Sequence, residues 1–163
     1  MFVGGETQLP VGFDAAQAGL AHLAHSGSLT TAAAEAYGDG LAGLVRVGPL
    51  GSAPGVSRLV EVRFRDLVIR DGAAVLTLRW EAIGVGGRLF PALDADITLT
   101  PAGEHASSLR LAGAYRPPLG LLGAGIDQAI LHRAAKATIR AFMSRLADAI
   151  AQPPRATETP TGE

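Results

Sequence analysis

Apolar and polar residues alternate along much of the middle of the chain. A two-residue period is typical of strands that bury one face. It predicts strands over residues 6–13, 41–47, 58–70, 73–83, 89–100 and 107–115, with loops at 48–57 and 101–106. The apolar positions of these strands would share one face of a single antiparallel sheet.

Two of these strands are joined by Asp71 and Gly72. This pair favours a type I′ turn, because both turn positions need positive φ. Counting outward from the turn pairs Ile69 with Ala74, apolar with apolar. We therefore predict a tight hairpin here.

The register of the hairpin predicts a β-bulge. Unbroken counting from the turn would set Phe64 opposite the charged Arg79. One extra residue near Arg65-Asp66 restores two apolar pairs, Phe64 with Leu78 and Val62 with Trp80. A bulge bends its strand, so we expect a curved sheet.

Helical patterns flank the strands on both sides. Residues 14–38 read as two short helices, with Asp14 as N-cap of the first and Gly27 at its end. The long segment 119–151 carries an apolar stripe at three- and four-residue steps. Its members are Leu131, Ala135, Ile139, Phe142, Met143, Leu146 and Ile150.

The pattern as a whole predicts an α+β protein. A curved antiparallel sheet of about 6–7 strands would have a long C-terminal helix lying along it, with two short helices after the first strand. We expect one domain over residues 1–151. The polar, Pro/Thr-rich segment 152–163 is expected to be a disordered tail.

Composition excludes several function classes. The chain of 163 residues is 48% hydrophobic and 18% charged, with a net charge of −1 and no cysteine. It has no run long enough for a membrane span and no secretory signal, and its scattered basic residues do not predict nucleic-acid binding. We expect a cytoplasmic protein without disulfides or thiolate metal sites.

No cofactor or metal is expected. Gly120, Gly123 and Gly125 have GxxGxG spacing, which departs from the dinucleotide-binding GxGxxG pattern and is followed by no parallel strand. His22 and His25 share a helix face but lack a third ligand, so a solvated pair is the simpler interpretation.

Some charged residues also have simpler structural interpretations. Asp94 and Asp96 share a strand face that points away from the apolar set, which favours an outer-face role beside Arg79 or Arg110. Asp127 near the start of the long helix is explained by the exposed N–H groups there.

The order of elements resembles the helix-grip fold of the START-like superfamily, also called SRPBCC proteins. The most local similarity is YRPPLGLLGAGIDQAILHRAAKATIRAFMSRLADAI at 115–150, which is similar to the last strand and closing helix of many uncharacterised bacterial members. This superfamily includes polyketide cyclases and lipid-transfer domains. The resemblance implies a helix-grip arrangement, in which the curved sheet wraps around the long C-terminal helix with an apolar cavity between them.

The inner face supplies the candidate ligand-binding residues. They are Val62, Phe64, Leu78, Trp80, Leu93, Ile97, Leu111, Tyr115, Ile130 and Ala134. The simpler interpretation is that most of them only form the core. Small residues on the long helix either allow close packing or leave volume unfilled, and the sequence leaves both open.

Three functions follow from this face. The leading one is binding of a small, largely apolar ligand such as a lipid, an isoprenoid or a polyketide-like compound. The second is a cyclase or aromatase-type enzyme, with Tyr115, Asp127 and His132 as candidate catalytic groups. The third is a cavity-free module that forms a homodimer through its apolar face. Tyr37, Arg116 and Thr138 are further candidates near the cavity.

Overall fold

The computed structural model describes residues 2–36, 60–82, 92–116 and 128–152. Helical residues 28–36 follow the first helix directly. The other elements in order are β1 (Phe2–Leu9), α1 (Phe13–Ser26), β2 (Val60–Phe64), β3 (Val68–Arg70), β4 (Ala73–Ala82), β5 (Ala92–Gly103), β6 (Ala106–Arg116) and α4 (Gln128–Ala151).

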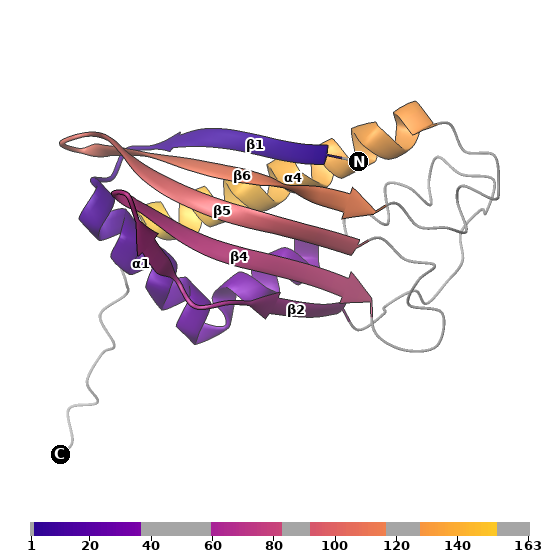
Figure 1. Cartoon of the computed structure of the whole chain (residues 1–163), viewed down its shortest axis with the longest axis horizontal. Coiled ribbons are helices and arrows are strands. Elements are labelled where there is room, and N and C mark those ends of the chain that lie inside the picture. Colours follow the sequence, from indigo (N-terminus) through magenta and orange to yellow (C-terminus); the bar gives the residue numbers. More distant parts are fainter. Residues whose placement is uncertain (1, 37–59, 83–91, 117–127, 153–163) are drawn as a thin grey trace, which may run out of the picture.

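The described strands form one antiparallel sheet in the order β1-β6-β5-β4-β2, with β3 also paired to β4. Helix α4 packs on β1 and β6, and α1 packs on β5, β6 and α4. Figure 1 shows both helices on the same side of the sheet. The predicted α+β architecture is confirmed.

The long helix matches the sheet in length. Its 24 residues span about 36 Å at 1.5 Å per residue. The 11 residues of β6 span about 36 Å at 3.3 Å per residue. Helix α4 is therefore as long as the strand β6 on which it packs, and its buried stripe includes Ile139, Phe142 and Leu146. No helix in the described part of the chain meets the length and hydropathy that a bilayer crossing needs.

The hairpin between β3 and β4 forms as predicted. Asp71 has φ 50° and Gly72 has φ 74°, the two positive values that a type I′ turn requires. Ile69 pairs with Ala74 beside this turn.

The predicted β-bulge is also confirmed. Phe64 pairs with Leu78, and Val68 pairs with Val75. Three residues of one strand thus lie opposite two of β4, and the extra residue falls within residues 65–67. The bulge keeps Phe64 on the same face as Leu78 and Ile69 on the same face as Ala74.

The start of the first helix differs from the prediction. The first strand is Phe2–Leu9 and not residues 6–13, because Pro10 has no N–H to continue a ladder. Helix α1 begins at Phe13, its N-cap is Gly12, and Asp14 lies inside the first turn. A Cβ on Gly12 would approach the Glu104 carbonyl oxygen to 2.9 Å, so a tertiary contact leaves no room for a side chain at the N-cap.

The turn between β5 and β6 is shorter than the predicted loop at 101–106. Pro101 still pairs with Ser107, and Gly103 pairs with Ala106 after a one-residue shift. Gly103 has φ 144°, a conformation that favours glycine and lets the strand continue. The predicted strand 41–47, the loop 48–57 and helical residues 119–127 lie outside the described residues.

Candidate functional site

One row of paired positions crosses the inner face of four strands. Trp80 pairs with Val62 on one side and with Leu93 on the other, and Leu93 pairs with Tyr115. Trp80 and Leu93 are fully buried, and Tyr115 is 5% exposed. The row lies near the end of β4 and the beginning of β5. The structure thus brings together four of the predicted ligand-binding positions.

The next two rows hold four more of the predicted residues. Phe64 pairs with Leu78, and Ile97 pairs with Leu111. Leu78, Ile97 and Leu111 are fully buried, whereas Phe64 is half-buried. The last two predicted residues, Ile130 and Ala134, belong to α4, and their side chains lie outside the described part.

Helix α4 meets the first row through Phe142. The rings of Phe142 and Trp80 lie edge to face, with centroids 5.8 Å apart and planes at 75°. This arrangement is favourable between aromatic rings. The spacing of the apolar stripe predicts Phe142 on the buried face of the helix, but its aromatic partner on β4 follows only from the tertiary structure.

Small residues shape the second row. Leu78 pairs with Ala95, and Ala95 pairs with Gly113. A Cβ on Gly113 would overlap the Ala95 side chain and the Asp94 carbonyl oxygen. Only glycine fits at position 113. The second row therefore has its smallest side chains at Ala95 and Gly113. The sequence placed both small residues on the inner face without revealing this close approach.

Few polar groups face the helix side of the sheet. Within the described strands, the inward positions carry no acid or base. Tyr115 is buried on β6, and Thr138 on α4 is 8% exposed. His132 is half-buried on α4, and Arg116 is exposed at the end of β6. Two other candidates, Asp127 and Tyr37, lie outside the described residues.

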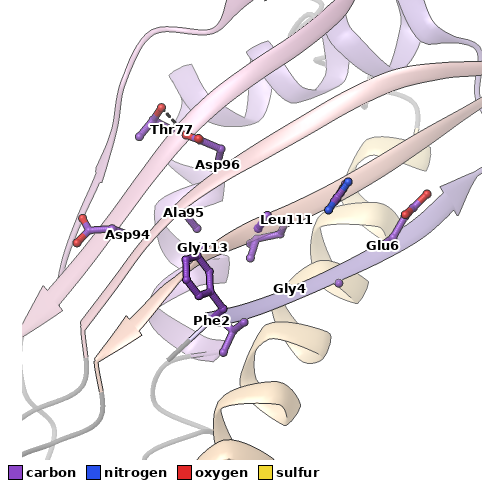
Figure 2. Close-up of a pocket in the computed structure, with 13 residues that line it drawn as sticks. Phe2, Gly4, Glu6, Thr77, Asp94, Ala95, Asp96, Leu111 and Gly113 are labelled. Atoms are coloured by element: carbon purple, nitrogen blue, oxygen red, sulfur yellow. Dashed lines mark hydrogen bonds between the residues drawn. The ribbon is translucent and has the colours of Figure 1, made fainter.

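The outer face of the sheet carries the charges. Arg79 and Asp94 form an ion pair at 3.6 Å with both side chains about half exposed. The Thr77 hydroxyl donates to Asp96 Oδ1 at 2.8 Å. These contacts confirm the outer-face interpretation of both aspartates, which Figure 2 shows on β5.

An open hollow of about 910 Å³ lies on the same outer face. Its centre is made of small residues, Gly4 paired with Ala112 across β1 and β6. Glu6 on its rim accepts a hydrogen bond from the Ser108 hydroxyl at 2.8 Å. Because it is open and lined by charged groups, this hollow does not resemble an apolar ligand cavity.

The two histidines of α1 are both exposed. The His25 ring Nδ1 lies 2.7 Å from the Ala21 carbonyl oxygen, a hydrogen bond within its own helix. In the ranges that the structure describes, no three potential ligands gather as a metal site.

Comparisons with known proteins point to the fold alone. No protein-family model matches the sequence, and no curated protein matches it significantly. A hypothetical protein from Helicobacter pylori aligns with a TM-score of 0.52 and 12% identity, covering 91% of this chain and 86% of that one. A conserved protein from Geobacillus kaustophilus aligns with a TM-score of 0.50 and 15% identity, covering 91% and 93%.

This is the helix-grip fold. The helix-grip architecture expected from the superfamily resemblance is confirmed. A norcoclaurine synthase point mutant from Thalictrum flavum aligns with a TM-score of only 0.40 and 16% identity, over 89% of this chain and 95% of that one. That likeness is too distant to bear on function, since one fold supports many functions.

Proposed function

We propose that this helix-grip protein binds a small, largely apolar molecule between the inner face of its sheet and α4. A lipid, an isoprenoid or a polyketide-like compound would fit this chemistry. The observation that carries the proposal is the row formed by Val62, Trp80, Leu93 and Tyr115. The described side chains of this row, those of Trp80, Leu93 and Tyr115, offer apolar surface and one hydroxyl group near the end of the sheet.

Affinity would come from buried area more than from polar contacts. A ligand burying ~300 Å² of apolar surface would gain roughly 7 kcal/mol at ~25 cal/mol per Å². A hydrogen bond to the Tyr115 hydroxyl would add about 1 kcal/mol. The tyrosine would therefore orient the ligand, and the apolar rows would hold it.

Binding is favoured over catalysis by the chemistry of this face. General acid–base catalysis needs titratable groups within reach of the substrate. The inward positions of the described strands carry none, and His132 is the half-buried candidate on the helix side. Contacts from Ile130 and Ala134, and a cytoplasmic location, remain predictions.

Native mass spectrometry and titration with an environment-sensitive apolar dye test the proposal. We expect a retained small molecule or saturable dye binding. The informative variant is Ala95→Leu, which adds volume to the inner face, and Ala114→Leu on the exposed side of β6 is its matched control. Dye affinity should fall at least tenfold for the first variant and stay unchanged for the second.

Leu93→Ala leaves more space at the same face and provides a second test if the Ala95→Leu variant does not fold. It should change dye affinity while retaining a cooperative unfolding transition. No retained ligand together with no saturable dye binding would overturn the proposal. A stable dimer by light scattering that excludes the dye would favour the homodimer module instead.

A further inference from the structure

The edge of β1 that faces away from β6 borders a groove along α4. Among the described strands, β1 is the edge of the sheet and pairs only with β6. Between β1 and α4 lies a groove of about 670 Å³. It runs from Gly4 to Pro10 on the strand side and from Lys136 to Ala151 on the helix side. An edge strand beside a groove can accept a further extended segment.

The backbone direction of this edge follows from one hydrogen bond. The Arg65 amide donates to the Thr77 carbonyl at 3.0 Å, so outward-facing residues of β4 direct their backbone groups toward β2. Strand β1 runs antiparallel to β4, so its outward-facing residues direct theirs the opposite way. The amides of Gly4 and Glu6 therefore point to the free edge.

We propose that residues 155–161 of this chain, which their composition alone predicts to be disordered, add to β1 as an antiparallel strand in the groove. Helix α4 ends at Ala151, which lines the same end of the groove as Leu9 and Pro10. Residues 152–154 would reverse the chain there. The seven residues of the segment then span about 23 Å at 3.3 Å per residue, which matches Phe2 to Gln8.

The proline of this segment agrees with only one phase of such a strand. In an added strand, alternate residues turn their N–H groups toward β1, and proline has no N–H to donate. Pro160 falls in one phase, whereas Thr157 and Thr159 share the other. The threonine phase would pair with β1 and face outward, so Pro160 would direct its backbone nitrogen to solvent.

The direction of the backbone groups across the sheet also favours pairing through the threonine phase. The added strand would run parallel to β4, so its outward-facing residues would direct their backbone groups toward β1. This sets Thr157 opposite Glu6 and Thr159 opposite Gly4. The intervening residues, Ala156 and Glu158, would face α4.

Charge in the groove also agrees with this register. Glu158 would lie opposite Gly5, where an added Cβ would contact Met143 at 3.8 Å and Ile139 at 3.9 Å. The exposed side chain of Arg140 follows Ile139 on α4 and lines the groove. Glu158 would thus pair with Arg140, and tethering to α4 would give the segment a high effective concentration.

Hydrogen exchange of the full-length protein, followed by NMR, tests the proposal with two neighbouring proline variants. Thr157→Pro removes an N–H that would pair with β1, whereas Ala156→Pro removes one that would face solvent. We expect the Glu6 and Gly4 amides to exchange at least tenfold more slowly in the wild type and in Ala156→Pro than in Thr157→Pro. The Leu111 amide, in the interior of the sheet, reports that the fold is intact.

Equal exchange of the Glu6 amide in all three proteins would overturn the proposal. Protection of the Glu6 amide that rises with protein concentration and is the same in both proline variants would also overturn it. That result would show that a second copy of the chain covers the edge of β1. A charge exchange gives an independent readout. Arg140→Glu should reduce the protection, and Arg140→Glu with Glu158→Arg should restore it.

Discussion

The indole of Trp80 on β4 and the phenyl ring of Phe142 on α4 lie edge to face, with centroids 5.8 Å apart. Both side chains are fully buried. This contact joins the end of the sheet to the middle of the long helix, so it sets how closely α4 approaches the inner face.

Phe142→Ala should be strongly destabilising. Removing a buried phenyl ring leaves a cavity and typically lowers the free energy of unfolding by about 3–5 kcal/mol. Urea denaturation followed by circular dichroism measures the loss. The control is Ile69→Ala, whose side chain is 51% exposed and should cost under ~0.5 kcal/mol. Similar losses for the two variants would contradict the packing described above.

Gly113→Ala and Gly5→Ala should change the free energy of unfolding by different amounts or in opposite directions. A methyl group on Gly113 would overlap Ala95, and such overpacking costs about 1–3 kcal/mol. On Gly5 the same group would make ordinary contact with Met143 at 3.8 Å, so the change should be neutral or stabilising by about 0.5 kcal/mol. Thermal unfolding of both variants measures the difference, and equal midpoints would refute it.

Gly72→Ala should weaken the hairpin through backbone conformation alone. Gly72 has φ 74° and no atom within 4 Å of an added Cβ, so only the left-handed conformation opposes a side chain. We expect a loss of about 1–2 kcal/mol. Gly72→Asn, which tolerates this conformation better, should recover part of the loss in urea denaturation. A larger loss for asparagine than for alanine would argue against this cause.

Tyr115→Phe should leave ligand binding largely intact. If buried area dominates affinity, losing one hydroxyl weakens binding by about 1 kcal/mol, or roughly fivefold. The dye titration measures this, with wild-type protein as reference. Complete loss of binding by a protein with an unchanged melting midpoint would instead show that the hydroxyl dominates recognition.

The outer-face ion pair should contribute little. Arg79 and Asp94 are about half exposed, and such pairs are worth about 0.2–1 kcal/mol. A double-mutant cycle with Arg79→Ala and Asp94→Ala should give a coupling in this range that falls at high salt. Neither variant should alter dye affinity, because both side chains lie on the far side of the sheet from α4.

Local pattern was sufficient for much of this fold. Alternation identified the inner face, because one-sided burial imposes a two-residue period on a strand. Asp71 and Gly72 predicted their turn, because it needs positive φ at both positions. The bulge before Val68 was predictable because only an extra residue there places Phe64 on the apolar face of the sheet.

Contacts between distant segments decided the rest. Gly12, the N-cap of α1, has no room for a side chain because the Glu104 carbonyl oxygen, some ninety residues away in sequence, lies against it. The Ser107 hydroxyl donates to the Val11 carbonyl at 2.8 Å and ties the same corner to β6. Contacts between segments so far apart in sequence produce no periodic pattern of apolar residues that the sequence would show. The sequence by itself therefore determined which face is apolar, and the tertiary structure decided how closely Gly113, Ala95 and Phe142 fill it.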